Sequence, residues 1–257
     1  MFRIVLLFIL ALGATAQAET AKPNTQVEKE KPFVLWGLSF SPYVRYVLTV
    51  LNTLKLPYEH KAILPSALLK ATGEEPPKEF EEISKKGKIP ALEDKKMGTS
   101  MVESWDIADN LIQNYGQSST LIPKCKLAKS RMRGYIEYAK AVIAPMTHQI
   151  AVEKYVKPNI LKQDADQQII ERNLQIVQNI FDVLEHILTP RKSGEPINYI
   201  ADTKNPSLAD MAVVSHIVTL KTVGYDLDKL TKDRPNLQKY LKRILDLPAF
   251  QEAMAAK

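Results

Sequence analysis

Apolar residues in the first part of the chain alternate between strand and helix patterns. Residues 33–37 (Phe-Val-Leu-Trp-Gly) form a short apolar run that predicts a strand. Ser41-Pro42 predicts a helix start, because the serine hydroxyl can satisfy an orphan amide and proline lacks one. Residues 58–62 predict a second strand, parallel to the first. The helix between them is indicated by apolar residues at steps of three and four: Val44, Val47, Leu48, Leu51 and Leu54.

The next stretch, residues 63–88, is rich in proline and charge and predicts little regular structure. One irregular helix is expected around residues 78–84. A third strand is expected over residues 89–93, where Pro90 opens the strand at a position that tolerates a missing amide.

A turn at Asp94-Lys95 and a weaker fourth strand over residues 96–101 follow. Glu103-Ser104 then leads into a helix that continues to Ile112 with apolar residues on one face. The order of these elements predicts an α/β domain over residues 32–115.

Downstream of this domain the period-two alternation of strands ends. Residues 116–124 predict a linker, and residues 125–257 predict an all-helical domain. The clearest helix is expected from Asp164 to Leu188, where apolar residues repeat at alternating steps of four and three.

The end of the chain carries further helix signals. Ser207 and Asp210 stand in capping-box spacing before an apolar run that ends at Leu220, which assigns both residues a structural role. Two short helices over residues 235–245 and 248–254 close the chain.

The N-terminus has the features of a cleavable export signal. Arg3 precedes a short apolar stretch, and Ala16-Gln17-Ala18 is a small-x-small cleavage site. Because the apolar stretch is shorter than the ~20 residues that span a bilayer, no stable membrane anchor is expected. Residues 1–18 are therefore expected to be a signal peptide and residues 19–31 a flexible leader, so that the mature protein is periplasmic or secreted.

Composition and charge exclude several classes of function. The net charge of +6 is spread along the chain, which argues against nucleic-acid binding. The single cysteine, Cys125, excludes an internal disulfide bond and is expected to be a partly buried bystander. No metal site is expected, because the histidines stand far apart and are expected to be ordinary surface or core residues: His60, His148, His186 and His216.

Four segments together make the chain resemble a glutathione transferase. The resemblance implies a thioredoxin-like α/β domain that holds glutathione, followed by an all-α domain that supplies most of the electrophile pocket. It also implies a homodimer, with glutathione as co-substrate and no other cofactor. The segments are residues 35–45 (Leu-Trp-Gly-Leu-Ser-Phe-Ser-Pro-Tyr-Val-Arg), 88–92 (Lys-Ile-Pro-Ala-Leu), 102–108 (Val-Glu-Ser-Trp-Asp-Ile-Ala) and 206–212 (Pro-Ser-Leu-Ala-Asp-Met-Ala).

The resemblance also implies roles for individual residues in binding glutathione. Pro90 should follow a cis peptide bond, with the backbone of Ile89 pairing with the cysteinyl part of glutathione. Glu103 and Ser104 should hold the γ-glutamyl end. The sequence agrees for Ser104, because a hydroxyl and free amides at a helix start suit a carboxylate. The glycyl carboxylate is expected to meet Lys88.

The chemical requirement of such a site is to hold glutathione as its thiolate, which is the nucleophile. A hydroxyl that donates to sulfur at the positive end of a helix provides this environment. Ser41 is the candidate for that hydroxyl, and Ser39 is the alternative. Tyr43 is expected to line the electrophile pocket. Reductase-like members of the family carry a cysteine at this position, so residues 41–44 indicate a serine-type member.

Two functions remain open from the sequence. The first is an enzyme that conjugates or reduces small electrophiles with glutathione. The second is a non-catalytic binding or scaffold protein with the same fold, in which Ser41 is only an N-cap worth about 1 kcal/mol.

Overall fold

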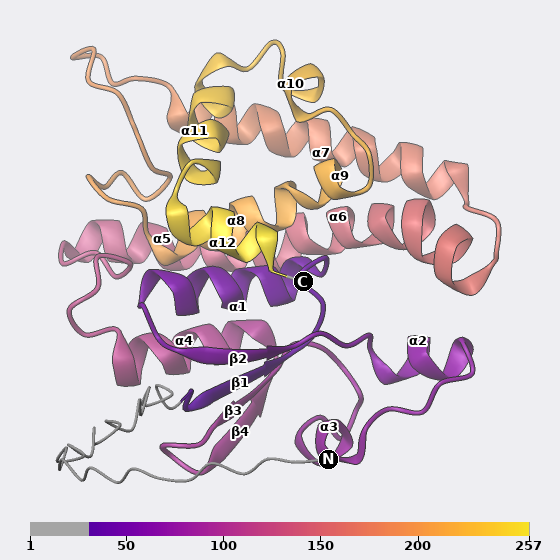
Figure 1. The fold of residues 1–257 in the computed structure, drawn as a ribbon. Coiled ribbons are helices and arrows are strands. Elements are labelled where there is room, and N and C mark those ends of the chain that lie inside the picture. Colours follow the sequence, from indigo (N-terminus) through magenta and orange to yellow (C-terminus); the bar gives the residue numbers. More distant parts are fainter. Residues whose placement is uncertain (1–30, 257) are drawn as a thin grey trace, which may run out of the picture.

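A computed structural model describes residues 31–256 of the chain (Figure 1). The predicted signal peptide, and all of the predicted leader except Lys31, lie outside the described residues. The first part holds a four-stranded sheet in the order β2-β1-β3-β4, in which β1 pairs in parallel with β2 and antiparallel with β3. The strands are β1 (Phe33–Trp36), β2 (Tyr58–Lys61), β3 (Ala91–Asp94) and β4 (Thr99–Val102).

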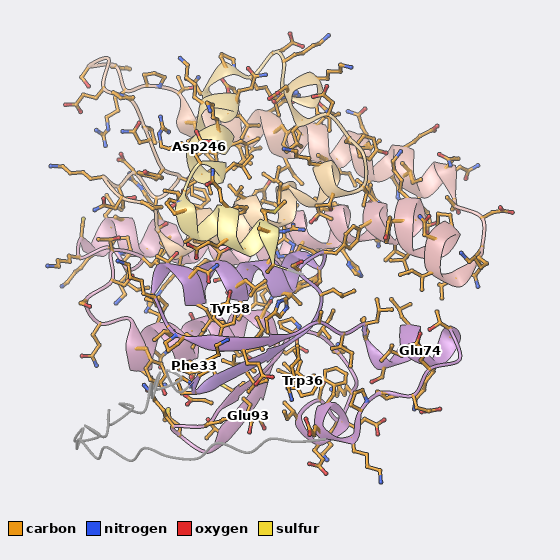
Figure 2. The ribbon with its side chains drawn as sticks, in the orientation of Figure 1. Phe33, Trp36, Tyr58, Glu74, Glu93 and Asp246 are labelled. Carbon is orange, nitrogen blue, oxygen red and sulfur yellow. The ribbon has the colours of Figure 1, made fainter. Side chains whose placement is uncertain are left out.

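The central strand β1 is buried on both faces, because its side chains alternate across the sheet. Phe33 packs into the large core on the side of α1 (Pro42–Thr53) and α4 (Ser104–Tyr115), whereas Trp36 packs on the other face against Phe80 of α3 (Lys78–Ile83) (Figure 2). The predicted strand-helix-strand unit with parallel strands is therefore confirmed.

Two details of this part differ from expectation. A short helix, α2 (Ser66–Ala71), was not predicted. Strands β3 and β4 also begin later than expected. The Asp94 carboxylate accepts hydrogen bonds from the backbone amides of Lys96 and Met97 at 3.0 and 3.1 Å, which holds these residues in a turn and delays the ladder to Thr99.

The second part is helical in the described residues, as predicted. Its clearest helix, α7, begins at Gln167 rather than Asp164, because the Asp166 carboxylate caps the amides of Gln168 and Ile169. The segment before α7 contains two π-helices that were not predicted. The elements are α5 (Lys126–Tyr138), η1 (Ala139–Ile143), α6 (Ala144–Ala151), η2 (Val152–Leu161), α7 (Gln167–Leu188), α8 (Leu208–Ile217), α9 (Thr219–Thr222), α10 (Leu227–Leu230), α11 (Pro235–Leu245) and α12 (Pro248–Ala255).

Helix α8 lies at the centre of the molecule, and every one of its residues is buried. The fully buried Asp210 carboxylate accepts hydrogen bonds from the Ser207 amide and hydroxyl, each at 2.7 Å, and from the Ile200 amide at 3.0 Å. The structural role expected for these residues at the start of the helix is thus confirmed. Helices α8 and α12 both pack on α1, which joins the helical part to the sheet.

Three further observations bear on the predictions from composition. Cys125 is exposed rather than partly buried, because it precedes the surface helix α5. Within residues 31–256, no helix has the length and apolar character needed to cross a membrane. The same residues contain no group of three or more His, Cys, Asp or Glu side chains arranged to hold a metal ion.

Candidate functional site

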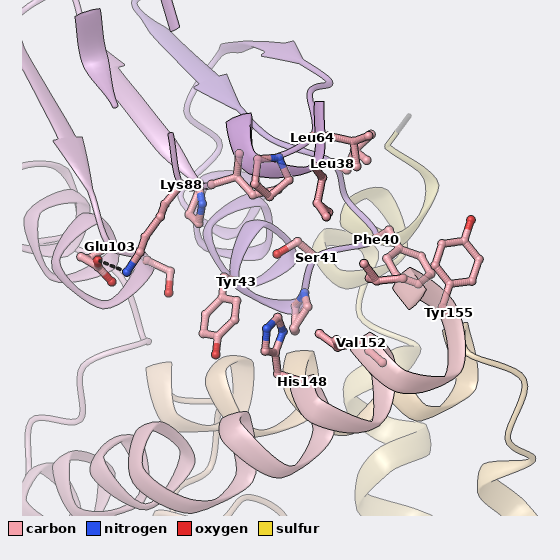
Figure 3. A pocket seen from close by; sticks show the side chains of 18 of the residues that line it. Leu38, Phe40, Ser41, Tyr43, Leu64, Lys88, Glu103, His148, Val152 and Tyr155 are labelled. Carbon is pink, nitrogen blue, oxygen red and sulfur yellow. Dashed lines mark ion pairs between the residues drawn. The ribbon is translucent and has the colours of Figure 1, made fainter. Parts of the chain in front are cut away.

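A pocket of about 820 Å³ opens where the sheet domain meets the helical part (Figure 3). The sheet domain contributes the loop between β1 and α1, residues 64, 65 and 68 at the start of α2, the loop before β3 and the start of α4. The helical part contributes residues of η1, α6 and η2. Because both parts of the chain line it, a molecule bound there contacts both.

Ser41 is the N-cap residue of α1, but its hydroxyl makes no capping hydrogen bond to the helix. The residue is half-buried and lines the pocket, where the unpaired amides of the first turn give the helix its positive end (Figure 3). The alternative candidate, Ser39, instead donates its hydroxyl to the backbone carbonyl of Ala256 at the end of the chain. Ser39 is absent from the residues that line the pocket.

Ser104 begins α4 on the opposite side of the pocket. It is 2% exposed, and its hydroxyl has no hydrogen-bond partner among the described residues. Glu103, immediately before it, has a φ of 69°, a left-handed conformation that costs free energy for a residue with a side chain. An unpaired buried hydroxyl beside a strained residue suits a site that a polar ligand completes.

The remaining residues expected to bind glutathione lie along the same edge of the pocket. The Ile89-Pro90 peptide bond is cis, as the resemblance implies. Lys88 forms an ion pair with Glu103, with Nζ and Oε1 3.8 Å apart (Figure 3). Both side chains are more than half exposed, so the pair contributes little to stability. The structure thus brings together residues 88–90, Glu103 and Ser104.

Tyr43 also lines the pocket, and two histidines lie around its ring. The ring centre of Tyr43 is 4.9 Å from that of His216 and 5.8 Å from that of His148. Burial and the nearby Glu103 raise the pKa of Tyr43, so its phenol is neutral near pH 7. His148 and Trp105 both line the pocket, and Trp105 stacks on the buried His216. The sequence offered no signal for this group, because the two histidines come from distant helices.

The other wall of the pocket is apolar and was not predicted residue by residue. Phe40, on the loop before Ser41, packs against Tyr155 of η2 with ring centres 4.5 Å apart and the rings tilted by 33°. This contact joins the sheet domain to η2 across the pocket. Lys140 of η1 adds a cation at the rim. The wall also includes the apolar residues Leu38, Leu64, Pro65, Leu68, Ala151, Val152, Val156 and Ile160.

Two family models match the chain. Residues 35–119 match the model described as "Glutathione S-transferase, N-terminal domain". Residues 167–243 match "Glutathione S-transferase, C-terminal domain". The segment between the two matches contains α5, η1, α6 and η2, and so includes the helical wall of the pocket.

Individual proteins agree with these matches over almost the whole chain. Glutathione S-transferase 3 of Zea mays is 26% identical over 226 residues, covering 88% of this chain and 94% of its own length. Glutathione S-transferase GstB of Escherichia coli K12 is 24% identical over 222 residues, covering 86% and 96%. Among solved structures, glutathione S-transferase III in apo form superposes with a TM-score of 0.71 at 24% identity over 88% of this chain and 96% of its own. Glutathione S-transferase-I bound with lactoylglutathione gives 0.71 at 21% identity, over 87% and 99%.

Proposed function

The chain belongs to the glutathione S-transferase family, and we propose that it is a serine-type enzyme that conjugates or reduces small electrophiles with glutathione. The observation that carries this proposal is the hydroxyl of Ser41. It lines the pocket at the positive end of α1 and does not cap the helix. Ser39, the alternative, is engaged with the end of the chain.

Glutathione is proposed to bind along the polar edge of the pocket. Its γ-glutamyl carboxylate accepts from the Ser104 hydroxyl and the first amides of α4, and Glu103 pairs with its ammonium group. The backbone of Ile89, held by the cis bond to Pro90, pairs with the cysteinyl part. Lys88 meets the glycyl carboxylate. Its exposed ion pair with Glu103 is weak enough to exchange for these contacts.

In the proposed reaction the glutathione thiol loses its proton to solvent and remains as a thiolate. The Ser41 hydroxyl donates a hydrogen bond to the sulfur, and the positive end of α1 stabilises its charge. The sulfur lone pair then forms a bond to the electrophilic carbon, and the leaving group departs with its bonding pair. The apolar wall that includes Phe40 and Tyr155 excludes water from the electrophile.

The test is to measure binding and turnover in three proteins: wild type, Ser41→Ala and Ser39→Ala. We expect the wild type to bind immobilised glutathione and to conjugate a chloronitrobenzene substrate. Ser41→Ala should lose roughly 10²- to 10³-fold in kcat, the effect of removing one donor to a developing anion, while retaining glutathione binding. Ser39→Ala should retain most of the activity.

Three outcomes would count against parts of this proposal. A wild type that neither binds glutathione nor turns over would favour the non-catalytic scaffold. A wild type that binds glutathione without turnover of any electrophile would limit the protein to binding. A larger loss of activity for Ser39→Ala than for Ser41→Ala would show that Ser39, and not Ser41, stabilises the thiolate.

We also propose that the protein is exported, with cleavage after Ala18, and that it forms a homodimer. The exposed edge strand β4 supports association, because the apolar side chains of Val102 and neighbouring Met97 are 36% and 50% exposed. N-terminal sequencing of the mature protein should begin at Glu19, and light scattering should give twice the monomer mass. An uncleaved N-terminus would refute the proposed signal cleavage, and a monomer mass would refute the proposed homodimer.

A further inference from the structure

Arg45 is a buried cation that the proposed chemistry leaves without a role. It lies one turn after Ser41 on α1 and is 1% exposed. Its guanidinium donates to the Ser215 carbonyl at 2.8 Å, to the Phe40 carbonyl at 3.1 Å and to the Thr219 hydroxyl at 3.4 Å. The side chain therefore turns back toward the loop that carries Ser41 and joins it to α8 and α9.

Within residues 31–256, no carboxylate forms an ion pair with Arg45. All the hydrogen-bond acceptors that Arg45 meets in the described residues are neutral, and its Nε has no partner there. Burial lowers the pKa of Arg45 to about 10, which leaves it charged at neutral pH. A buried guanidinium that meets only neutral acceptors costs stability and leaves a net positive charge inside the protein.

We propose that Arg45 is the buried countercharge of the glutathione thiolate. It does not touch the sulfur, but it lies behind the loop that carries Ser41 and stabilises the negative charge from there. This inference rests on the proposed function. The Phe40 carbonyl that Arg45 holds belongs to the residue immediately before Ser41, so the guanidinium lies against the backbone next to Ser41 without itself lining the pocket. In this interior a unit charge acts over several ångströms with little screening. The positive charge therefore favours thiolate over thiol.

The other charged and titratable groups around the site do not provide the same field. Lys88 and Glu103 form an exposed ion pair in the ligand-free protein, and with glutathione bound they are proposed to pair with its glycyl carboxylate and its ammonium group, so neither leaves an unpaired charge for the sulfur. Lys140 is exposed to solvent, which screens it. The neighbouring aromatic and imidazole groups are neutral near pH 7: burial raises the pKa of Tyr43, desolvation lowers that of His148, and burial together with Arg45 lowers the pKa of His216 to about 3.

A matched pair of variants at Thr219 tests the charge while leaving Arg45 in place. Thr219 is fully buried with its hydroxyl beside the guanidinium. Thr219→Asp supplies the missing carboxylate, and Thr219→Asn has the same shape without charge. The readout is the ultraviolet absorbance of the thiolate of bound glutathione as a function of pH. It is combined with the pH profile of kcat/KM for the electrophile, measured at saturating glutathione.

We expect Thr219→Asp to raise the pKa of the bound thiol by about one unit, which lowers kcat/KM about tenfold below that pKa. Well above the pKa, where all of the glutathione is ionised, the loss should disappear. Thr219→Asn should leave the thiol pKa near the wild-type value. A purely structural role of Arg45 would give losses that do not depend on pH.

Variants of Arg45 itself provide a second test that does not depend on the folding of Thr219→Asp. Arg45→Lys retains the charge and should keep the thiol pKa, whereas Arg45→Met should raise it by about one unit. An unchanged thiol pKa in both Thr219→Asp and Arg45→Met, or equal shifts in Arg45→Lys and Arg45→Met, would overturn the inference. A wild type that does not bind glutathione would instead overturn the proposed function, so the two failures are distinguishable.

Discussion

At the scale of single residues, Ser104 shows a conflict between stability and binding. Its hydroxyl is buried without a partner, so it lowers the stability of the ligand-free protein and is proposed to gain a partner when glutathione binds. We expect Ser104→Ala to leave the free energy of unfolding unchanged or to raise it by up to about 1 kcal/mol. Glutathione affinity should fall roughly tenfold, the loss of one hydrogen bond to a charged group.

Urea unfolding and calorimetric titration with glutathione measure the two effects on the same samples. Ser84→Ala is a suitable control, because that equally buried hydroxyl already donates to the Lys88 carbonyl at 2.8 Å. It should lose stability rather than gain it. A Ser104→Ala protein that is clearly destabilised but binds normally would show that the hydroxyl has a structural partner instead.

The individual residues of the polar edge could be predicted from the sequence, because they belong to short local patterns. Ser41-Pro42 and Glu103-Ser104 are helix starts, and the cis bond before Pro90 followed from the family resemblance. His148 and Tyr155 could not be predicted in the same way. They reach the pocket from the helical part, and their positions depend on how distant elements pack.

At the scale of elements, η2 is the part of the fold that sequence patterns described least well. Only Glu153 is buried in this π-helix, so no apolar stripe marks a face toward the core. Its apolar residues Val152, Val156 and Ile160 line the pocket instead, at steps of four. A π-helix closes i→i+5 bonds, so its turn is wider than that of an α-helix and steps of four remain on one face. Neither family model matches this segment.

Glu153 anchors η2, and its contacts predict that the free energy of unfolding depends on pH. Its carboxylate pairs with Lys157 at 2.7 Å and accepts from the Asp166 amide at 2.8 Å, tying η2 to the start of α7. These contacts, with Lys157 the larger cause, lower the pKa of Glu153 below its ordinary 4.5. A carboxyl group with a lowered folded pKa stabilises the fold above its ordinary pKa, and this contribution is lost as the pH falls through the lowered value.

We therefore expect Glu153→Gln to lower the free energy of unfolding by about 1–2 kcal/mol at neutral pH, as for a hydrogen bond to a charged group. The difference from wild type should shrink as the pH falls below 4.5 and should vanish once the pH is below the lowered folded pKa, where the carboxyl group is protonated in both states. Urea unfolding at several pH values measures it. If the difference in the free energy of unfolding stays constant across this pH range, Glu153 stabilises η2 through its packing and not through its charge.

At the scale of the whole molecule, one hydrophobic core runs through both parts of the chain. The cluster that includes Phe33 and Leu35 of the sheet also includes the buried residues of α8 and α11. Helix α1 carries Ser41 at its start and packs on both α8 and α12, so the site depends on the contact between the two parts. The sequence predicted both parts separately, but it contained no pattern for their shared core, because that core depends on contacts between residues far apart in the chain.

This shared core predicts that the two parts unfold together and that glutathione stabilises both. We expect a single calorimetric transition in which the calorimetric and van't Hoff enthalpies per cooperative unit agree. Glutathione at a hundredfold excess over its Kd should add about 2.7 kcal/mol and raise the Tm by roughly 5–10 °C without splitting the transition. Glutathione contacts are proposed almost entirely on the sheet domain, so separate units would respond differently. Two transitions, of which glutathione shifts only one, would show that the pocket joins two units that fold independently. The contacts of α1 with α8 and α12, together with the Phe40–Tyr155 contact, would then be the boundary between them.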